Sequence, residues 1–527
     1  MIAGCKNSVI PNSVARIGDS AFGWCSELTE LVLPNSVTSI VESAFAYCSG
    51  LEKITVESGN SCYDSRDNCN SIIETETNTL IAGCKNSVIP NSVTSIGDSA
   101  FEGCTGLTEL TLPKSVTSIG DGAFAYCSGL TELTLSNSLK CIEAYAFSGC
   151  RGITKLTLPN SVTSIGDSAF GGCSGLTELT LPNSVKSIGD GAFADCSGLE
   201  KITVESGNSR YDSRDNCNSI IDKKTNTLIA GCKNSVIPNS VARIDGLAFC
   251  GCSGLTELTL PNSVKSIGDG AFADCSGLEK ITVESGNSCY DSRDNCNSII
   301  ETETNTLIAG CKNSVIPNSV TSIGDSAFEG CTGLTELTLP DNIHFIEGEA
   351  FMGCSGLTEL TLPNSVKSIG DGAFAYCSGL TELTLPDSVA CIGDFAFSLC
   401  SGLTELTLPN SLTEIGKSAF RGCSGLTELT LPNSVTSIGD GAFRGCRGLT
   451  GLTLPNSVTS IGESAFYLCS GLSKITSLAE IPPMCGFKVF NGVNKTNCEL
   501  IVPEGSVAAY TRAEDWNKFS NIRGFSK

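Results

Sequence analysis

The sequence predicts a repeat solenoid, a stack of coils in which each coil buries its apolar face against its neighbours. The prediction rests on a repeated motif and on its spacing. Ile…Ala-Phe…Cys occurs sixteen times in 527 residues, with Ile five residues before the Phe, Ala immediately before it and Cys three after it. The spacing is 23 residues in two long runs, from Phe101 to Phe193 and from Phe328 to Phe466. A fixed period of this size is typical of stacked supersecondary units.

Each repeat is expected to begin with a strand that has one apolar face. In the repeat from residue 176 to 198, Leu179 and Leu181 alternate with Glu178 and Thr180. Side chains alternate between the two faces of a strand, so the leucines should face the core and the polar residues should face solvent.

The rest of the repeat should return to the core through a turn. Pro182 ends the strand because it has no N–H to donate. Val185, Ile188 and Phe193 then point inward, and Asp190 is placed to N-cap a short helical turn. Such coils form a leucine-rich repeat of short period. We expect a superhelix of about twenty coils, with a continuous parallel β-sheet on one face and short helical turns on the other.

Three stretches, which we call the islands, interrupt the period within residues 51–101, 199–249 and 278–328. Each contains the loop Tyr-Asp-Ser-Arg-Asp-Asn-Cys-Asn and then a hairpin-like segment, SIIETETNTLIAG in the first copy. Each ends in Ser-Val-Ile-Pro, which is expected to add a strand to the stack. Residues 51–113 and 278–340 are identical, which is more typical of a duplicated scaffold than of a unique catalytic pocket.

We expect the solenoid to span residues 1–475, and residues 476–527 to form a degenerate last coil and a C-terminal cap. A final strand is predicted at 498–503 and an amphipathic helix at 506–519, with Val507, Tyr510, Trp516 and Phe519 as its apolar face. The chain opens in the middle of a unit that recurs complete at residues 228–244. We therefore expect an N-terminus truncated mid-unit.

The net charge limits the classes of partner. The chain carries a formal charge of −23, which disfavours binding to nucleic-acid phosphates and docking on anionic lipid. No apolar run reaches the roughly 18 residues of a membrane span, and no signal peptide opens the chain. We expect no nucleic-acid partner, no membrane insertion and a monomer.

Sixteen of the thirty cysteines occupy one repeat position, from Cys25 to Cys469. Neighbours in such a column lie about 5 Å apart with parallel Cβ vectors, whereas a disulfide needs Cβ atoms about 3.8 Å apart. We therefore expect a ladder of buried thiols acting as small apolar groups. A linear column with one histidine in the chain, His344, does not supply converging metal ligands. No metal and no cofactor are expected.

Eight further cysteines leave two alternatives open, disulfide or two thiols. Six of them flank the predicted hairpins of the islands, and two lie near the cap. The candidate pairs are Cys69 with Cys84, Cys217 with Cys232, Cys296 with Cys311, and Cys485 with Cys498.

The outward strand positions are the candidate ligand-binding surface. The third position of the strand is Glu in ten of sixteen repeats and Lys in five, and the fifth position is Thr in fifteen. An acidic, threonine-lined face could receive a basic or glycan partner. The same residues also suit a soluble parallel strand by β-propensity. The candidate residues are Glu132, Thr134, Glu359, Thr361, Glu382, Thr384, Glu405, Thr407, Glu428 and Thr430.

A column of aspartates recurs at the predicted turns. Calcium needs six to eight oxygens converging on one point, and helix capping already accounts for a single Asp at this position, so capping is the favoured interpretation. The column comprises Asp98, Asp121, Asp167, Asp190, Asp371, Asp394 and Asp440.

Catalysis is not expected. Nucleophilic catalysis needs a base oriented beside a nucleophile, and His344 has no Ser, Cys or acid motif around it. Neither a phosphate-binding loop nor a dinucleotide fingerprint follows a strand. The sequence therefore favours a non-enzyme.

The repeat L-x-x-L-x-L-P-x-S-V-x-x-I-G-x-x-A-F-x-x-C-x-x resembles the BspA-like, treponemal-type leucine-rich repeats. The first island, Tyr63 to Pro90, is similar to that family's interruption. The tail, with Val502-Pro-Glu-Gly-Ser506, Tyr510 and Trp516-Asn-Lys-Phe519, resembles the ending common in Bacteroidetes members.

The resemblance implies a secreted or surface-displayed protein, and adhesion to host matrix proteins or to other cells. We therefore expect a non-catalytic binding or adhesion scaffold of an exported bacterial protein, recognising a protein or glycan ligand through its repeat surface. The export signal absent from this chain would have been lost with the truncated N-terminus. The alternative is a structural spacer that presents another module.

Overall fold

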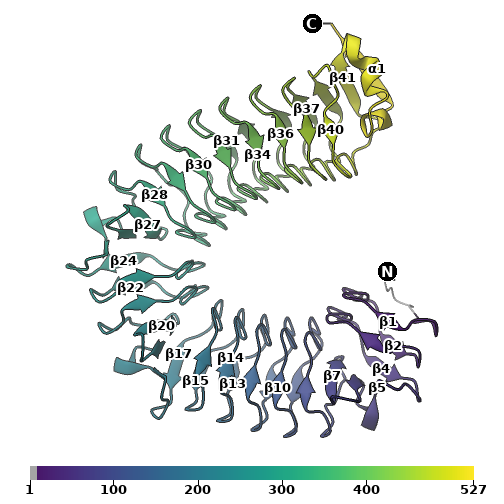
Figure 1. Ribbon diagram of the computed structural model, residues 1–527. Helices are drawn as coiled ribbons and strands as arrows, with labels where there is room; N and C mark the ends of the chain where they lie inside the picture. The colour runs from purple at the N-terminus through teal and green to yellow at the C-terminus, as the bar shows by residue number, and fades with distance from the viewer. Residues whose placement is uncertain (1–8, 527) are drawn as a thin grey trace. The chain divides into compact units, whose positions relative to one another are not determined.

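The computed structural model describes residues 9–526, and the first eight residues of the expected mid-unit start lie outside this range. The chain divides into two compact units, Met1–Leu255 with Ser266–Ala271, and Thr256–Lys265 with Phe272–Lys527. Each unit is a parallel β-solenoid, and its short strands follow one another coil by coil along the chain (Figure 1). The predicted fold class is confirmed.

The Leu-rich segments form the first column of strands, in which neighbours pair in parallel and in register. Glu178, Leu179 and Thr180 pair with Lys201, Ile202 and Thr203 of the next coil. The strands of the first unit are β2 (Glu30–Leu33), β4 (Lys53–Val56), β9 (Glu109–Thr111), β11 (Glu132–Thr134), β13 (Lys155–Thr157), β15 (Glu178–Leu181) and β17 (Lys201–Val204). Those of the second unit are β22 (Glu257–Leu260), β24 (Lys280–Val283), β31 (Glu382–Thr384), β33 (Glu405–Thr407), β35 (Glu428–Thr430), β37 (Gly451–Leu454) and β39 (Lys474–Ser477).

This column is not one continuous ladder. In the first unit it consists of the groups β2–β4, β9–β11 and β13–β15–β17. In the second unit, Thr338, Thr361 and Thr384 are joined only by single bridges. The expected continuous sheet is therefore broken into short hydrogen-bonded groups.

A second column, which the sequence analysis did not predict, is built from two-residue strands that end in the repeat's Ile. In the first unit these are β1 (Arg16–Ile17), β3 (Ser39–Ile40), β8 (Ser95–Ile96), β10 (Ser118–Ile119), β12 (Cys141–Ile142), β14 (Ser164–Ile165), β16 (Ser187–Ile188), β21 (Arg243–Ile244) and β23 (Ser266–Ile267). In the second unit they are β28 (Ser322–Ile323), β29 (Phe345–Ile346), β30 (Ser368–Ile369), β32 (Cys391–Ile392), β34 (Glu414–Ile415), β36 (Ser437–Ile438) and β38 (Ser460–Ile461), followed by β40 (Met484–Cys485). These strands form the longer ladders, and five of them lie with three strands of the first island in one eight-stranded sheet.

The islands contain the predicted hairpin. In the first island, β6 (Ile72–Glu74) pairs antiparallel with β7 (Thr79–Ala82) and with β5 (Tyr63–Asp64). The strand β7 then joins the second column through a parallel pair with β8. The other islands repeat this arrangement with β18 (Tyr211–Asp212), β19 (Ile220–Asp222) and β20 (Thr227–Ala230), and with β25 (Tyr290–Asp291), β26 (Ile299–Glu301) and β27 (Thr306–Ala309). Each island also has one 3-10 turn, η1 (Arg66–Asn68), η2 (Arg214–Asn216) or η3 (Arg293–Asn295).

The strand expected at Ser-Val-Ile-Pro does not form. Residues 87–90 are irregular, and the Val88 side chain is 69% exposed. The Val88 N–H donates to the Cys69 carbonyl within the island. The island therefore contributes a strand to the stack through β7.

The repeat's phenylalanines form the core as a stack of rings. Phe351, Phe374 and Phe397 are fully buried, with ring centroids 5.1 and 5.3 Å apart. The stack continues to Phe490, whose ring lies 5.8 Å from that of Phe466. A fully buried Phe contributes about 1.5–3 kcal/mol to folding, so this column accounts for much of the stability of each coil.

The chain ends in a small cap. The strand β41 (Glu499–Pro503) pairs with β39 and with β42 (Asn521–Phe525), which the sequence did not predict. The helix expected at 506–519 is wrong in extent, because only α1 (Val507–Tyr510) is α-helical, flanked by the 3-10 turns η4 (Glu504–Ser506) and η5 (Trp516–Lys518). Its apolar side chains pack as predicted, with Tyr510, Trp516 and Phe519 buried.

The short helical turns expected in the coils are hydrogen-bonded turns without helix. Within residues 9–526, α1 is the only α-helix. No helix of this part of the chain is long and apolar enough to cross a bilayer.

Candidate functional site: the acidic strand face

The first column of strands places its Glu and Thr side chains in solvent, as the alternation predicts. In β31, Glu382 and Thr384 are exposed while Leu383 between them is buried. The ten predicted surface residues are all exposed: Glu132, Thr134, Glu359, Thr361, Glu382, Thr384, Glu405, Thr407, Glu428 and Thr430. We call the outward side of this column the strand face.

In the second unit the strand face carries an unbroken column of glutamates. Five successive coils have Glu at the third strand position and an exposed Thr two residues later, from Glu336 to Glu428. Glu382 and Glu405 lie directly opposite each other in register. Like charges opposite one another in a sheet destabilise it, so the fold does not require this arrangement.

Some other glutamates of the strand face have basic neighbours, although Glu109 and Glu132 of the first unit lie opposite each other. Lys53 Nζ lies 2.6 Å from Glu30 Oε1 in the first unit, and Lys280 Nζ lies 3.7 Å from Glu257 Oε2 in the second. Within residues 9–526, no ion pair involves a glutamate of the five-coil column. Its charge is therefore available to a partner.

Behind the strand face, the repeat's cysteines form a buried column, as predicted. In eleven coils the thiol donates to the carbonyl of the Phe 26 residues earlier; Cys400 Sγ lies 3.1 Å from Phe374 O. Burial raises the pKa of the Cys48 thiol to about 12 and that of Cys469 to about 12. Burial also raises the pKa of Cys400 well above its usual value. These thiols are structural donors and not nucleophiles.

The eight cysteines considered as disulfide pairs are free thiols in this structure: Cys69, Cys84, Cys217, Cys232, Cys296, Cys311, Cys485 and Cys498. In the first island each sulfur has its own polar contacts, since Cys69 Sγ donates to Ser71 O at 3.7 Å and Cys84 Sγ accepts from Asn70 Nδ2 at 3.2 Å. Of the two alternatives left open by the sequence, the structure therefore contains the thiols.

Most aspartates of the column accept hydrogen bonds from backbone N–H groups of the next coil and not of the coil that contains them. Asp98 Oδ1 accepts the backbone N–H of Asp121 in the next coil at 2.8 Å, and Asp371 Oδ1 accepts that of Asp394 at 2.7 Å. The predicted N-cap of a helix in the same coil is wrong, because no helix forms there. Six of the seven carboxylates of the column instead join two successive coils, and Asp190, which precedes the second island, is the exception.

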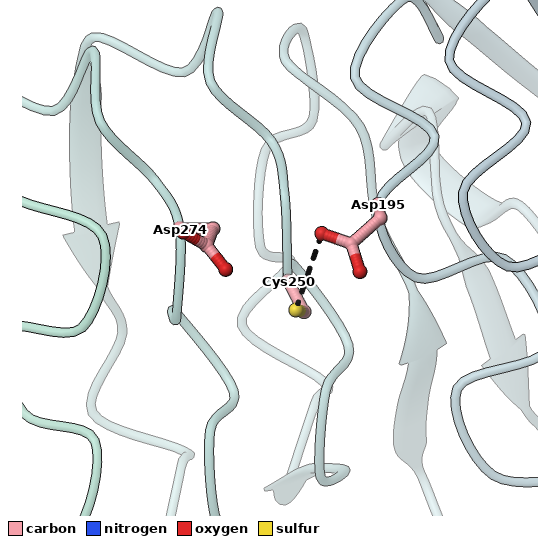
Figure 2. A group of neighbouring side chains, drawn as sticks. All are labelled: Asp195, Cys250 and Asp274. Atoms are coloured by element: carbon pink, nitrogen blue, oxygen red, sulfur yellow. Dashed lines mark hydrogen bonds between the residues drawn. The ribbon is translucent and has the colours of Figure 1, made fainter. Parts of the chain in front are cut away.

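Two polar features lie outside these columns. His344 Nδ1 lies 3.3 Å from the Ser365 carbonyl, so its ring is engaged by backbone and not by a nucleophile. Cys250 Sγ lies 3.7 Å from Asp195 Oδ1 (Figure 2), and the Asp195 N–H donates to the Cys250 carbonyl at 2.8 Å. No motif of the sequence indicates this contact, which joins the coils on either side of the second island.

Comparisons with known proteins agree with the repeat. The family model described as "BspA type Leucine rich repeat region (6 copies)" matches residues 3–83, 81–200, 219–311, 306–426 and 390–497. No curated protein matches the sequence.

Several solved structures resemble the chain. A leucine-rich cell surface protein from Faecalibacterium prausnitzii is 25% identical, with 88% of this chain and 83% of that chain covered and a TM-score of 0.34. A leucine-rich repeat protein from Bacteroides ovatus is 22% identical, with 97% and 88% covered and a TM-score of 0.30. One from Eubacterium ventriosum is 23% identical, with 84% and 88% covered and a TM-score of 0.36.

Proposed function

Because the chain belongs to the BspA-type leucine-rich-repeat family, we propose that it is a non-catalytic binding scaffold. It acts as part of an exported bacterial protein, outside the cell or on its surface, and recognises a protein or glycan partner through the strand face. The cell-surface description of the similar F. prausnitzii protein supports this location.

The observation that carries the proposal is the column of glutamates from Glu336 to Glu428. It places five carboxylates and five threonine hydroxyls at intervals of about 4.8 Å, all exposed. A regular array of weak contacts can bind a repetitive or extended partner strongly through multivalency. The negative charge favours a partner with basic groups and speeds its association.

Binding is tested with the purified chain against a panel of host matrix proteins and glycans, at low salt and at physiological salt. We expect a basic partner to bind more weakly at the higher salt, because exposed charges are screened over about 8 Å. Reversing Glu359, Glu382 and Glu405 to Lys should weaken binding by at least tenfold.

A matched control distinguishes the effect of charges on the strand face from the effect of the chain's net charge. Glu349, Glu414 and Glu463 are exposed in the same unit but lie outside the first column of strands. Reversing these three to Lys changes the net charge by the same amount and should leave affinity within about twofold. Equal losses in both triple variants would contradict the proposal, and absence of binding in either salt would favour the structural spacer.

A further inference from the structure

The first island leaves a cavity in the stack of coils. It has a volume of about 450 Å³ and is lined by Phe45, Ile81, Glu42, Asp98 and Ser99, among others. Phe45 is only half-buried, unlike the other rings of the column, and residues of the hairpin strand β7 line the cavity with it. The lining therefore combines the apolar Phe45 and Ile81 with the exposed carboxylates of Glu42 and Asp98.

A second hollow of about 290 Å³ adjoins the first and shares Glu42, Asp98 and Ser99 with it. It adds two tyrosines, Tyr126 and Tyr145, whose side chains are 48% and 54% exposed. The aromatic surface extends further through Tyr47, whose ring lies 5.8 Å from that of Tyr126.

The carboxylates of the two hollows have no basic partner. Glu42 and Asp98 line both hollows, Glu143 lines the first, and Glu102 and Asp121 line the second. Within residues 9–526 none of these five forms an ion pair. No Lys or Arg lines either hollow.

We propose that this double hollow binds the cationic side chains of a basic peptide, with arginine preferred. The aliphatic part of the side chain would lie on Phe45 and Ile81, as long cationic side chains do on apolar surfaces. The guanidinium would meet Glu42 and Asp98, since its planar donors match carboxylates. A second cation would lie over the exposed Tyr126 and Tyr145 rings.

The second island shows how the same place is closed. Its residue equivalent to Ser99 is Leu247, and both residues have a left-handed backbone, with φ of 52° and 57°. Leu247 Cδ1 lies 3.0 Å from where a Cβ on Gly191 would stand, and Phe193 of that coil is only 5% exposed. At the third island, whose sequence is identical to that of the first, Phe272 is 8% exposed beside Ser326. The open hollow therefore depends on the coil that precedes the first island, residues 40–45, and none of its lining residues belongs to the strand face.

The test measures fluorescence anisotropy of a labelled Ser-Gly-Arg-Gly-Arg-Gly-Ser peptide with the full chain. The same peptide with citrulline in place of arginine, a neutral analogue of nearly equal shape, is the first control. We expect saturable binding of the arginine peptide and at least tenfold weaker binding of the citrulline peptide. Equal binding of the two peptides, or no saturable binding of the arginine peptide, would overturn the proposal.

Variants place the binding in the hollow. Ser99→Leu introduces the side chain found in the second island and should weaken binding of the arginine peptide at least tenfold. Glu42→Gln should weaken binding of this peptide about threefold or more. Glu76→Gln removes one exposed charge of the same unit at a residue that lines neither hollow and should leave the affinity for the arginine peptide within twofold. The triple reversal of Glu359, Glu382 and Glu405 to Lys should also leave the affinity for the arginine peptide within twofold. The proposal for the hollow and the proposal for the strand face can therefore be contradicted independently of each other.

Three results would overturn the proposal. The first is that Ser99→Leu and Glu42→Gln leave the affinity of the arginine peptide unchanged, with circular dichroism confirming that both variants are folded. The second is that the strand-face reversal abolishes peptide binding. The third is that a neutral oligosaccharide binds and the arginine peptide does not, with oligosaccharide binding lost in Tyr126→Ala, which would assign the aromatic surface to a glycan.

Discussion

A regular coil and an island coil differ at one position of the stack, where the regular coil has Phe and the island coil has Gly. In a regular coil the Phe N–H donates to the carbonyl of the Ala in the next coil, as Phe374 does to Ala396 at 2.7 Å. In the first island Gly83 makes this bond, to Ala100 at 2.9 Å. A Cβ on Gly83 would lie 2.1 Å from the ring of Phe101.

The same substitution recurs in the other islands, where a Cβ on Gly231 would lie 2.2 Å from the ring of Phe249 and one on Gly310 2.1 Å from that of Phe328. The backbone ladder is thus kept while the ring of the following coil fills the space that the island's own ring would occupy. An island coil is therefore a regular coil without its own ring. Substitutions should destabilise the two kinds of coil in opposite ways: a smaller residue leaves a cavity in a regular coil, and a larger residue overpacks an island coil.

Emptying a regular coil should have the largest effect. Phe374→Ala removes a fully buried ring between Phe351 and Phe397 and should cost about 3–5 kcal/mol. Thr384→Ala on the strand face should cost under about 1 kcal/mol. Urea unfolding of both variants checks this, and equal losses would mean that the two faces of the coil are assigned wrongly.

Overfilling an island should have the next largest effect. Gly83→Ala forces a methyl group against the Phe101 ring and should cost about 1–3 kcal/mol. Gly18→Ala is the control, because a Cβ there meets nothing within 4 Å. Identical unfolding midpoints for the two variants would contradict the close packing of ring on glycine.

The thiol column should make the regular coils sensitive to alkali. The buried thiols have a pKa near 12 in the folded chain, as for Cys48 and Cys377, against an ordinary value of 9.0. Their stabilising contribution is therefore complete below about pH 9 and is lost as pH rises toward 12, because the unfolded chain releases these protons first. Urea midpoints measured from pH 8 to 10.5 should fall, and Cys377→Ala should reduce the fall while the exposed Cys391→Ala should not.

Thiol reactivity should distinguish the buried column from the exposed and partly exposed cysteines, with little change in stability. Cys391 is exposed, and Cys62, Cys141, Cys289 and Cys485 are partly exposed, so these should react with an alkylating reagent in the native chain. The column should react only after unfolding. Unfolding without reductant should reveal at least sixteen alkylatable thiols, and four or fewer would refute the thiol column.

The sequence predicted the buried columns because each has a period of 23 residues and a single residue type. It also predicted the outward Glu and Thr residues, since strand alternation assigns them without knowledge of the neighbouring coil. What it missed depends on contacts between coils. The second column has strands of two residues, too short for alternation to detect, and Asp98 bonds a backbone group 23 residues away. Phe490 was not predicted to belong to the ring column, because it follows Phe466 by 24 residues and lacks the Ala and Cys of the motif.

The sequence does indicate which residue replaces the ring in an island. The segment Ile-Ala-Gly-Cys recurs in all three islands, and its Ala-Gly stands where a regular coil has Ala-Phe. The strand expected at Ser-Val-Ile-Pro is wrong, because the sequence does not reveal that β7 is the strand that joins the ladder. The hollow beside Phe45 required the structure, since Phe193 and Phe272 precede equivalent islands and are buried.

A double-mutant cycle between Gly83 and Phe101 tests the equivalence of island and regular coils most directly. Gly83→Ala, Phe101→Leu and the double variant are compared with the original chain by urea unfolding. We predict that Gly83→Ala costs less once Phe101 is Leu, with a coupling of about 0.5–3 kcal/mol, because the smaller side chain leaves room for the methyl group. Additive effects within about 0.5 kcal/mol would contradict the account, since they would mean that the Phe101 ring does not fill the place of the missing island ring.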